Sequence, residues 1–117
     1  MKLALLSDIH SNVQALDACL EHAEAAGAQR FALLGDLVGY GADPVAVVQR
    51  VMQLAGDGAI VLKGNHDEMA VTPEGGNKTL GGSTADWTHA QLDARQRAFL
   101  DQLPMTHRED AVLLVHA

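Results

Sequence analysis

The apolar residues of the chain fall into short continuous runs, separated by longer segments of mixed polarity. The four runs are residues 2–6, 31–34, 59–62 and 111–115. A strand with one face in water would alternate apolar and polar residues, whereas a continuous run is typical of a parallel strand buried on both faces. The pattern therefore predicts four strands in a mainly parallel sheet.

The segments between these strands repeat their apolar residues at helical spacing. The first helix is expected to begin at Ser11, which has Gln14 three residues later as in a capping box, and to end at Gly27. The second helix opens with Asp43-Pro44, a cap followed by proline in the first turn, and closes at Gly56. Its buried stripe is predicted to comprise Val47, Val48, Val51 and Leu54.

A third helical region is expected over residues 83–102, with a break near Asp93. It follows residues 72–83, a segment rich in glycine and polar residues that we interpret as a mobile loop. The order of elements is β-α-β-α-β-loop-α-β, which predicts an α/β fold with a mainly parallel sheet flanked by helices. We expect a single domain over residues 1–117.

Composition narrows the class of protein. The formal charge is −7 and aromatic residues make up 3% of the chain, so a basic or base-stacking surface for stable nucleic-acid binding is not expected. No apolar run approaches the roughly 20 residues that span a bilayer, and the first run is interpreted as a strand rather than a signal peptide. Cys19 is the single cysteine and is expected to be a buried thiol. These features predict a cytoplasmic protein without a membrane partner.

Polar residues cluster where each predicted strand ends. The clusters are Asp8-Ile9-His10, Gly35-Asp36, Gly64-Asn65-His66-Asp67 and His116. Because ligands of open α/β sheets bind outside the carboxyl ends of the strands, we expect these side chains to share one crevice. Carboxylate, amide oxygen and imidazole suit two divalent ions such as Mn, Fe, Zn or Mg, of which Mn is favoured.

Two neighbouring metal ions need a shared carboxylate and a shared water, and they acidify that water and neutralise phosphoryl oxygens during in-line attack. Asp36 is the natural bridge. The other candidate ligands are Asp8 and His10 on one side and Asn65 and His116 on the other. His66 lies beside a candidate ligand and is placed to protonate the leaving oxygen.

The series D-x-H, G-D-x-V-x-x-G, G-N-H-D and a late histidine reads SDIHSN, GDLVGYG, GNHD and VLLVHA in this chain. It resembles the calcineurin-like metallophosphoesterase superfamily. The resemblance implies the N-terminal half of that family's β-sandwich, which is flanked by helices. It implies two sets of metal ligands, which are Asp8, His10 and Asp36 for the first ion and Asp36, Asn65 and His116 for the second. His66 would be the general acid.

The start of the first helix offers free N–H groups to phosphate oxygens. Asn12 is therefore a candidate substrate contact together with Asn65 and His66, and simple capping is the alternative for Asn12. Asp67 and Glu68 either orient a metal-bound imidazole or form a solvated pair.

Two departures from the family pattern bear on function. Gly39 and Tyr40 stand where the superfamily's protein Ser/Thr phosphatases and dinucleoside-tetraphosphate hydrolases have Asp and Arg. The change removes a partner of the catalytic histidine and a bidentate phosphate clamp, and it fits the bacterial and archaeal phosphodiesterase-like branch better. The family's terminal G-H-x-H motif does not occur in these 117 residues. The resemblance therefore implies a truncated chain with one ligand missing from each metal.

The leading functional hypothesis is metal-dependent hydrolysis of a small phosphodiester or phosphomonoester by a metal-bridging water or hydroxide. One alternative is a protein Ser/Thr phosphatase or a dinucleoside-polyphosphate hydrolase. Another is a non-catalytic module that binds metal or a partner. Because the second half of the sandwich would be missing, an apolar sheet face would be exposed, and self-association is expected.

Overall fold

The computed structural model describes residues 1–75 and 79–117 of the chain. Its central element is a parallel sheet in the order β1-β2-β3, formed by β1 (Leu3–Leu6), β2 (Arg30–Leu33) and β3 (Ile60–Val61). Parallel strands end at the same edge of a sheet, so the loops that follow all three strands meet there. The α/β fold with a parallel sheet flanked by helices is therefore confirmed for the first three apolar runs.

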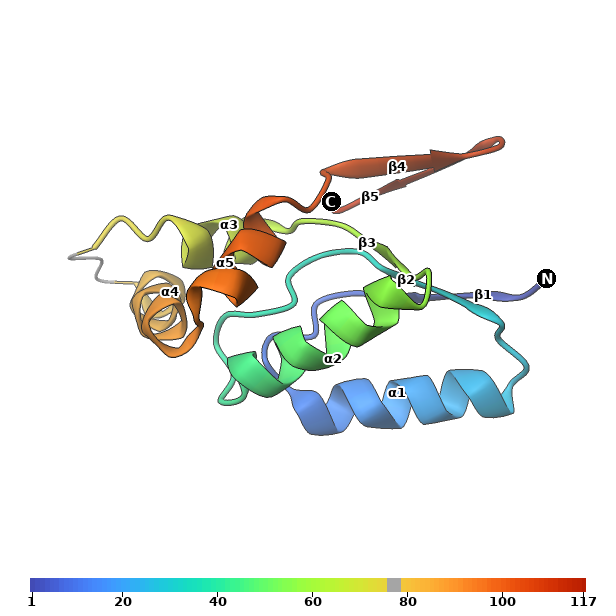
Figure 1. Ribbon diagram of the computed structural model, residues 1–117, viewed down its shortest axis with the longest axis horizontal. Coiled ribbons are helices and arrows are strands. Elements are labelled where there is room, and N and C mark those ends of the chain that lie inside the picture. Colours follow the sequence, from blue (N-terminus) through green and yellow to red (C-terminus); the bar gives the residue numbers. More distant parts are fainter. Residues whose placement is uncertain (76–78) are drawn as a thin grey trace.

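Helices α1 (Val13–Ala25) and α2 (Pro44–Gly56) lie together on one face of this sheet (Figure 1). Each turns an apolar stripe toward the strands, as residues three or four positions apart do on a helix. The stripes are formed by the buried side chains of Leu16 and Leu20 in α1 and of Val47, Val48, Val51 and Leu54 in α2. They pack with Leu33 and Val61 in one core, and the predicted stripe of α2 is confirmed.

Two predictions about α1 were wrong. Asn12 caps the helix in place of Ser11, because its Oδ1 accepts a hydrogen bond from the N–H of Ala15 at 3.0 Å. Cys19 is exposed rather than buried. Leu16 and Leu20 define the buried stripe of this helix, and Cys19 lies about 100° around the helix from Leu20.

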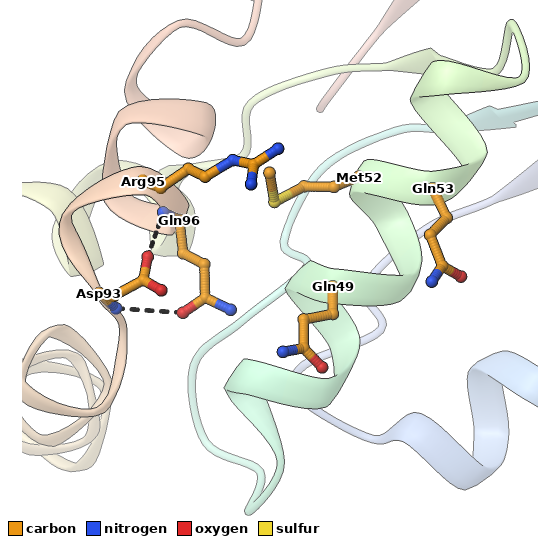
Figure 2. A pocket seen from close by; sticks show the side chains of 6 residues that line it. All are labelled: Gln49, Met52, Gln53, Asp93, Arg95 and Gln96. Carbon is orange, nitrogen blue, oxygen red and sulfur yellow. Dashed lines mark hydrogen bonds between the residues drawn. The ribbon is translucent and has the colours of Figure 1, made fainter.

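Three short helices gather at the edge where the strands end: α3 (Asn65–Val71), α4 (Leu80–Gln91) and α5 (Ala94–Asp101) (Figure 1). The predicted break near Asp93 is confirmed. Asp93 caps α5, since its Oδ1 accepts from the N–H of Gln96 at 2.8 Å and its own N–H donates to Oε1 of Gln96 at 3.1 Å (Figure 2).

The short helix α3 was not predicted, and α4 begins at Leu80, within the segment expected to be a loop. Residues 76–78 of that segment lie outside the described residues. In the part of the chain that the structure describes, no helix is long and apolar enough to cross a membrane.

The last two strands, β4 (Thr106–Glu109) and β5 (Val112–Val115), form a separate antiparallel hairpin. The hairpin lies on the opposite side of the sheet from α1 and α2 (Figure 1). Its buried side chain is Leu114, which joins a second small cluster with Ala32, Ile60 and Leu62. Leu5 of β1 stays 55% exposed, so the expectation that every strand is buried on both faces fails at β1.

The prediction that residues 111–115 form a parallel strand was also wrong. Their partner β4 has the sequence Thr-His-Arg-Glu, which contains no apolar residue and gave no strand signal. Asp110 turns the chain back with a φ of 52°, the left-handed conformation that tight hairpin turns require.

Leu114→Ala is expected to lower the free energy of unfolding by about 2–4 kcal/mol, because the side chain is buried between the hairpin and the sheet. Leu113→Ala is the matched control. Leu113 is 50% exposed, so its loss should change the free energy by about 0.5 kcal/mol or less. Urea unfolding of dilute protein measures both variants, and equal losses would contradict the placement of the hairpin.

The hairpin is also tied to β2 by an ion pair. Nη1 and Nη2 of Arg30 donate to the two carboxylate oxygens of Glu109 at 2.6 and 2.5 Å. These hydrogen bonds lower the pKa of Glu109 below its usual 4.5. A carboxyl group with a depressed folded pKa contributes stability above its unfolded pKa, and this contribution is lost as the pH falls through the folded value.

Protection of the hairpin amides from hydrogen exchange should therefore fall as the pH drops below 4.5, where Glu109 begins to protonate. Glu109→Gln should show weaker protection at neutral pH and no further acid-dependent loss. Glu21→Gln, an exposed change on α1, serves as control. Wild-type protection that matches Glu109→Gln at every pH would show that the ion pair does not hold the hairpin.

Candidate metal centre

Backbone hydrogen bonds hold the first two strand-end loops side by side. Three N–H groups of the β1–α1 loop donate hydrogen bonds to backbone carbonyl oxygens of the β2–α2 loop. They run from Asp8 to Gly35 at 3.1 Å, from His10 to Asp36 at 3.0 Å and from Ser11 to Leu37 at 2.8 Å. Asp8, His10 and Asp36 have φ values of 57°, 48° and 54°. These left-handed conformations are uncommon outside glycine. They bend the two loops so that the three side chains meet.

Asp36 lies at the centre of this arrangement and is 4% exposed. Its Oδ2 is 3.7 Å from Nε2 of His10 and 3.4 Å from Nε2 of His116. Its Oδ1 accepts a hydrogen bond from the N–H of His66 at 3.0 Å. Among the described residues, ligand atoms of Asp8, Asp36 and His116 lie within 4.8 Å of one another. One carboxylate thus faces both candidate imidazoles.

Both imidazoles are oriented by backbone carbonyl groups. Nδ1 of His10 is 3.0 Å from the oxygen of Val38, and Nδ1 of His116 is 2.8 Å from the oxygen of Leu34. A bond from Nδ1–H to a carbonyl leaves the Nε2 lone pair free, which is how metal-bound histidines are commonly held. Both Nε2 atoms lie near Oδ2 of Asp36.

His116 provides a test of whether a metal fits. Its Nε2 is 3.1 Å from Oδ1 of Asn65 and 3.4 Å from Oδ2 of Asp36, while its Nδ1 faces the Leu34 carbonyl. Both ring nitrogens therefore face oxygen acceptors, but a neutral imidazole has only one N–H. A cation among the Nε2 atom and these oxygens would satisfy all of them. The residues fit a divalent metal ion with oxygen and nitrogen ligands.

Two glycines allow the second and third strand-end loops to approach each other. A Cβ atom at Gly64 would lie 2.2 Å from both N and Oδ1 of Asp36. A Cβ atom at Gly35 would lie 2.7 Å from N of Gly64 and 2.9 Å from Nδ1 of His116, and Gly35 also has a φ of 101°. Side chains at either position would push the candidate ligands apart.

The side chain of His66 makes different contacts from those of His10 and His116. Its Nδ1 is buried without a hydrogen-bond partner in the described part of the chain. Its ring lies 5.1 Å from the ring of His10 and 4.7 Å from the ring of Tyr40. No backbone carbonyl holds the Nδ1 atom as at His10 and His116, so the geometry separates His66 from the candidate ligands.

Asp67 has a role that sequence reasoning missed. The side chain is fully buried, and its Oδ1 accepts from the N–H groups of Leu37 and Val38 at 2.9 and 3.2 Å. Its Oδ2 accepts from the N–H of Gly64 at 2.8 Å. Burial raises the pKa of Asp67 to about 6, against the lowering effect of these donors. Neither earlier interpretation holds, because Asp67 joins two backbone loops and Glu68 is exposed.

The signal for Asp67 was present in the sequence. An acidic residue at the third position of a helix commonly accepts from the N–H of the cap residue, as in a capping box. The bonds from Asp67 to the β2–α2 loop had no such local signal.

Asp8 and Asn12 border a cavity of about 540 Å³ beside the candidate ligands, which His10 and Tyr40 also line. The hydroxyl of Ser7 donates to Oδ2 of Asp8 at 2.6 Å, and this bond is the main reason that the pKa of Asp8 is lowered. The carboxylate is therefore ionised and available near neutral pH. Asn12 uses its Oδ1 to cap α1, while its amide N–H₂ can still donate to a ligand.

A second cavity, of about 550 Å³, lies between α2 and α5 (Figure 2). It is lined by Gln49, Met52, Gln53, Asp93, Arg95 and Gln96. None of these residues is a candidate ligand, and Asp93 and Gln96 are already occupied in capping α5.

The geometry agrees with the comparisons to known proteins. The model of the calcineurin-like phosphoesterase superfamily domain matches residues 1–117. The chain belongs to this superfamily, whose members are metal-dependent phosphoesterases.

Two curated relatives and one solved structure illustrate the relationship. An uncharacterised protein of Methanocaldococcus jannaschii is 34% identical over 110 residues, which cover 92% of this chain and 44% of that protein. A symmetrical bis(5'-nucleosyl)-tetraphosphatase of Paraburkholderia phymatum is 34% identical over 85 residues, covering 71% of this chain and 30% of that enzyme. The crystal structure of a metallophosphoesterase from Sphaerobacter thermophilus superimposes with a TM-score of 0.76 at 32% identity, covering 93% of this chain and 44% of that one. The chain thus spans less than half the length of these relatives.

Asp67→Asn is expected to destabilise the metal-free protein by about 1–3 kcal/mol, because an amide nitrogen in place of one oxygen cannot accept the buried N–H groups. Glu68→Gln, the same change at the exposed neighbouring residue, should be close to neutral. Denaturant unfolding compares the two. A neutral Asp67→Asn variant would mean that these amide hydrogen bonds do not hold the loops.

Proposed function

We propose that the protein hydrolyses a small phosphodiester or phosphomonoester at a site for two divalent metal ions. The observation that carries the proposal is the Asp36 carboxylate, which lies between Nε2 of His10 and Nε2 of His116 at 3.7 and 3.4 Å. Backbone carbonyls orient both imidazoles toward it. The family and the clustered oxygen and nitrogen donors, of which Asp36 is buried, support the same reading.

Asp36 would be shared between the two ions. Asp8 and His10 would complete the first set of ligands in this chain, and Asn65 and His116 the second. Carboxylate, amide and imidazole donors suit Mn, Fe, Zn or Mg, with Mn favoured. When bound, such ions acidify a water molecule and neutralise charge on phosphoryl oxygens.

His66 would protonate the leaving oxygen. Its ring lies at the crevice beside His10, yet it does not share the carbonyl anchoring of the candidate ligands. Asn12 borders the adjacent cavity, and its N–H₂ group would donate to a substrate oxygen. Asn65 would contact both metal and substrate. Metal binding and proton transfer would thus be carried out by different side chains.

A second candidate is hydrolysis of dinucleoside polyphosphates, which the name of the Paraburkholderia relative favours. Rates with bis-p-nitrophenyl phosphate, p-nitrophenyl phosphate and diadenosine tetraphosphate would separate the two candidates. A phosphopeptide in the same comparison tests the protein phosphatase alternative. The −7 formal charge supports a small metal-recruited substrate over nucleic acid.

The proposal includes a cytoplasmic location without a membrane partner. It also includes self-association, because Leu5, Leu113 and Val115 leave apolar surface exposed at 55%, 50% and 43%. A second copy would cover part of this surface. Dependence of the unfolding midpoint on protein concentration tests the association, and its absence would contradict it.

His66→Ala should lower kcat by about 10²–10⁴-fold while metal content stays unchanged, as expected for the loss of a general acid. Asp36→Asn should instead lose metal and activity together. Metal analysis after gel filtration, paired with phosphodiesterase assays, distinguishes the two patterns. His22→Ala, an exposed histidine change on α1, is the control.

Loss of metal in His66→Ala would show that His66 is a metal ligand. Metal binding by the wild-type protein without turnover of any tested substrate would favour the non-catalytic module. Removal of metal by a chelator should abolish activity, and re-addition of Mn²⁺ should restore it.

A further inference from the structure

The imidazole of His66 is held by packing rather than by a hydrogen bond to its Nδ1. That atom is buried and has no partner among the described residues. The backbone N–H of His66 donates to Oδ1 of Asp36, which fixes the start of α3 but leaves the side-chain torsions free. Some other group must therefore set the direction of the ring.

Tyr40 is the side chain best placed to do so. Its ring centroid is 4.7 Å from that of His66, with 50° between the planes, and 5.1 Å from that of His10. Both values lie in the range of favourable aromatic contacts. The three rings form one cluster, in which Tyr40 touches both the candidate acid and a candidate ligand.

Two glycines complete a slot for the His66 ring. A Cβ atom at Gly39 would lie 3.0 Å from Nδ1 of His66, and one at Gly81 would lie 3.3 Å from its Cε1. Gly81 belongs to α4, so the slot joins the second strand-end loop to a helix far along the chain. Tyr40 is the large side chain that the second strand-end loop places against this ring.

Tyr40 is itself held in an unusual conformation. Its φ is 59°, a left-handed value that is unfavourable for a residue other than glycine. Its N–H donates to Oγ1 of Thr84 on α4 at 3.2 Å. At Gly41, the next residue, a Cβ atom would lie 2.1 Å from the carbonyl oxygen of His10. The loop thus maintains a strained tyrosine against the histidine cluster, and strain of this kind is typical of functional sites.

We propose that Tyr40 is a positioning residue, whose ring sets the orientation of His66 for proton donation to the leaving group. The inference rests on the proposed role of His66. In this chain, aromatic packing takes the place of a carboxylate partner, since position 39 is glycine. The ring carries the effect, and the phenolic hydroxyl is dispensable.

The first test needs no activity. In the metal-free protein, the ring current of Tyr40 should displace the Cε1–H resonance of His66, which His66→Gln identifies by its disappearance. Tyr40→Leu should move this resonance toward the free-histidine position, while Tyr40→Phe should leave it in place. Trp87→Leu removes another half-exposed aromatic ring, on α4, and should leave it in place too. An unchanged resonance in Tyr40→Leu would overturn the proposal.

The second test uses the metal-loaded protein and two leaving groups. Tyr40→Leu should lower kcat on the order of 10–100-fold for an ester of a simple alcohol, because a misplaced acid protonates poorly. The loss should be smaller for p-nitrophenol, which needs little protonation. Tyr40→Phe should stay within about threefold of wild type with both substrates. Metal content is measured in each variant and should be equal.

Several results would contradict the proposal. An equal loss of kcat in Tyr40→Phe would show that the phenolic hydroxyl is required. An equal loss with both leaving groups, or a parallel loss of metal, would assign Tyr40 to substrate binding or to support of His10. If the wild-type protein hydrolyses no phosphoester, the proposed function fails, and the His66 resonance still reports whether the ring of Tyr40 lies against that of His66.

Discussion

The close approach of the second and third strand-end loops is the constraint on which the rest of the structure depends. Gly64 lies so near Asp36 that a Cβ atom would be 2.2 Å from the carboxylate. This approach lets the N–H of His66 reach Oδ1 of Asp36 at 3.0 Å. Asp67 then joins the same loops through buried bonds to Leu37, Val38 and Gly64. The sheet brings the loops to one edge, and these contacts hold them together so that they line a single crevice.

The three histidines of the crevice differ in the contact that their Nδ1 atom makes. Carbonyl groups hold Nδ1 of His10 and His116, and their Nε2 atoms consequently face Asp36. His66 has the same side chain and lies in the same crevice, yet its Nδ1 has no partner among the described residues. Fixed tautomers suit metal ligands. The Nδ1 atom of His66 has no such anchor, which agrees with the proposed role in proton transfer.

The two faces of the sheet are covered to different extents. On one face, α1 and α2 lie over the strands (Figure 1) and pack with them in the larger apolar core. On the other, the β4–β5 hairpin contributes Leu114 as its buried side chain, and Leu5 of β1 remains exposed. The candidate metal centre lies at the strand ends, and His116, which follows β5, links it to the hairpin. The well-packed helical face therefore stabilises most of the site, and the less covered face positions its last ligand.

Much of this arrangement could be predicted from the sequence, because the signals are local. Continuous apolar runs indicated the three parallel strands, helical spacing indicated α1 and α2, and a polar cluster followed each strand. Parallel strands end at one edge, so the meeting of Asp8, Asp36 and Asn65 required no knowledge of side-chain packing. The break at Asp93 was likewise encoded by a local capping pattern.

The remaining features join residues that are distant in the chain, and only the tertiary structure decided them. The strand at residues 112–115 has the composition of a parallel strand, but it pairs with β4, whose four residues carry no apolar signal. Tyr40 meets His66 and is anchored by Thr84, which is 44 residues away. Pairing register and ring contacts depend on which surfaces fold against each other, and no local pattern contains that information. The sequence by itself determined which residues could form the centre, whereas the packing of loops and helices decided how each one is held.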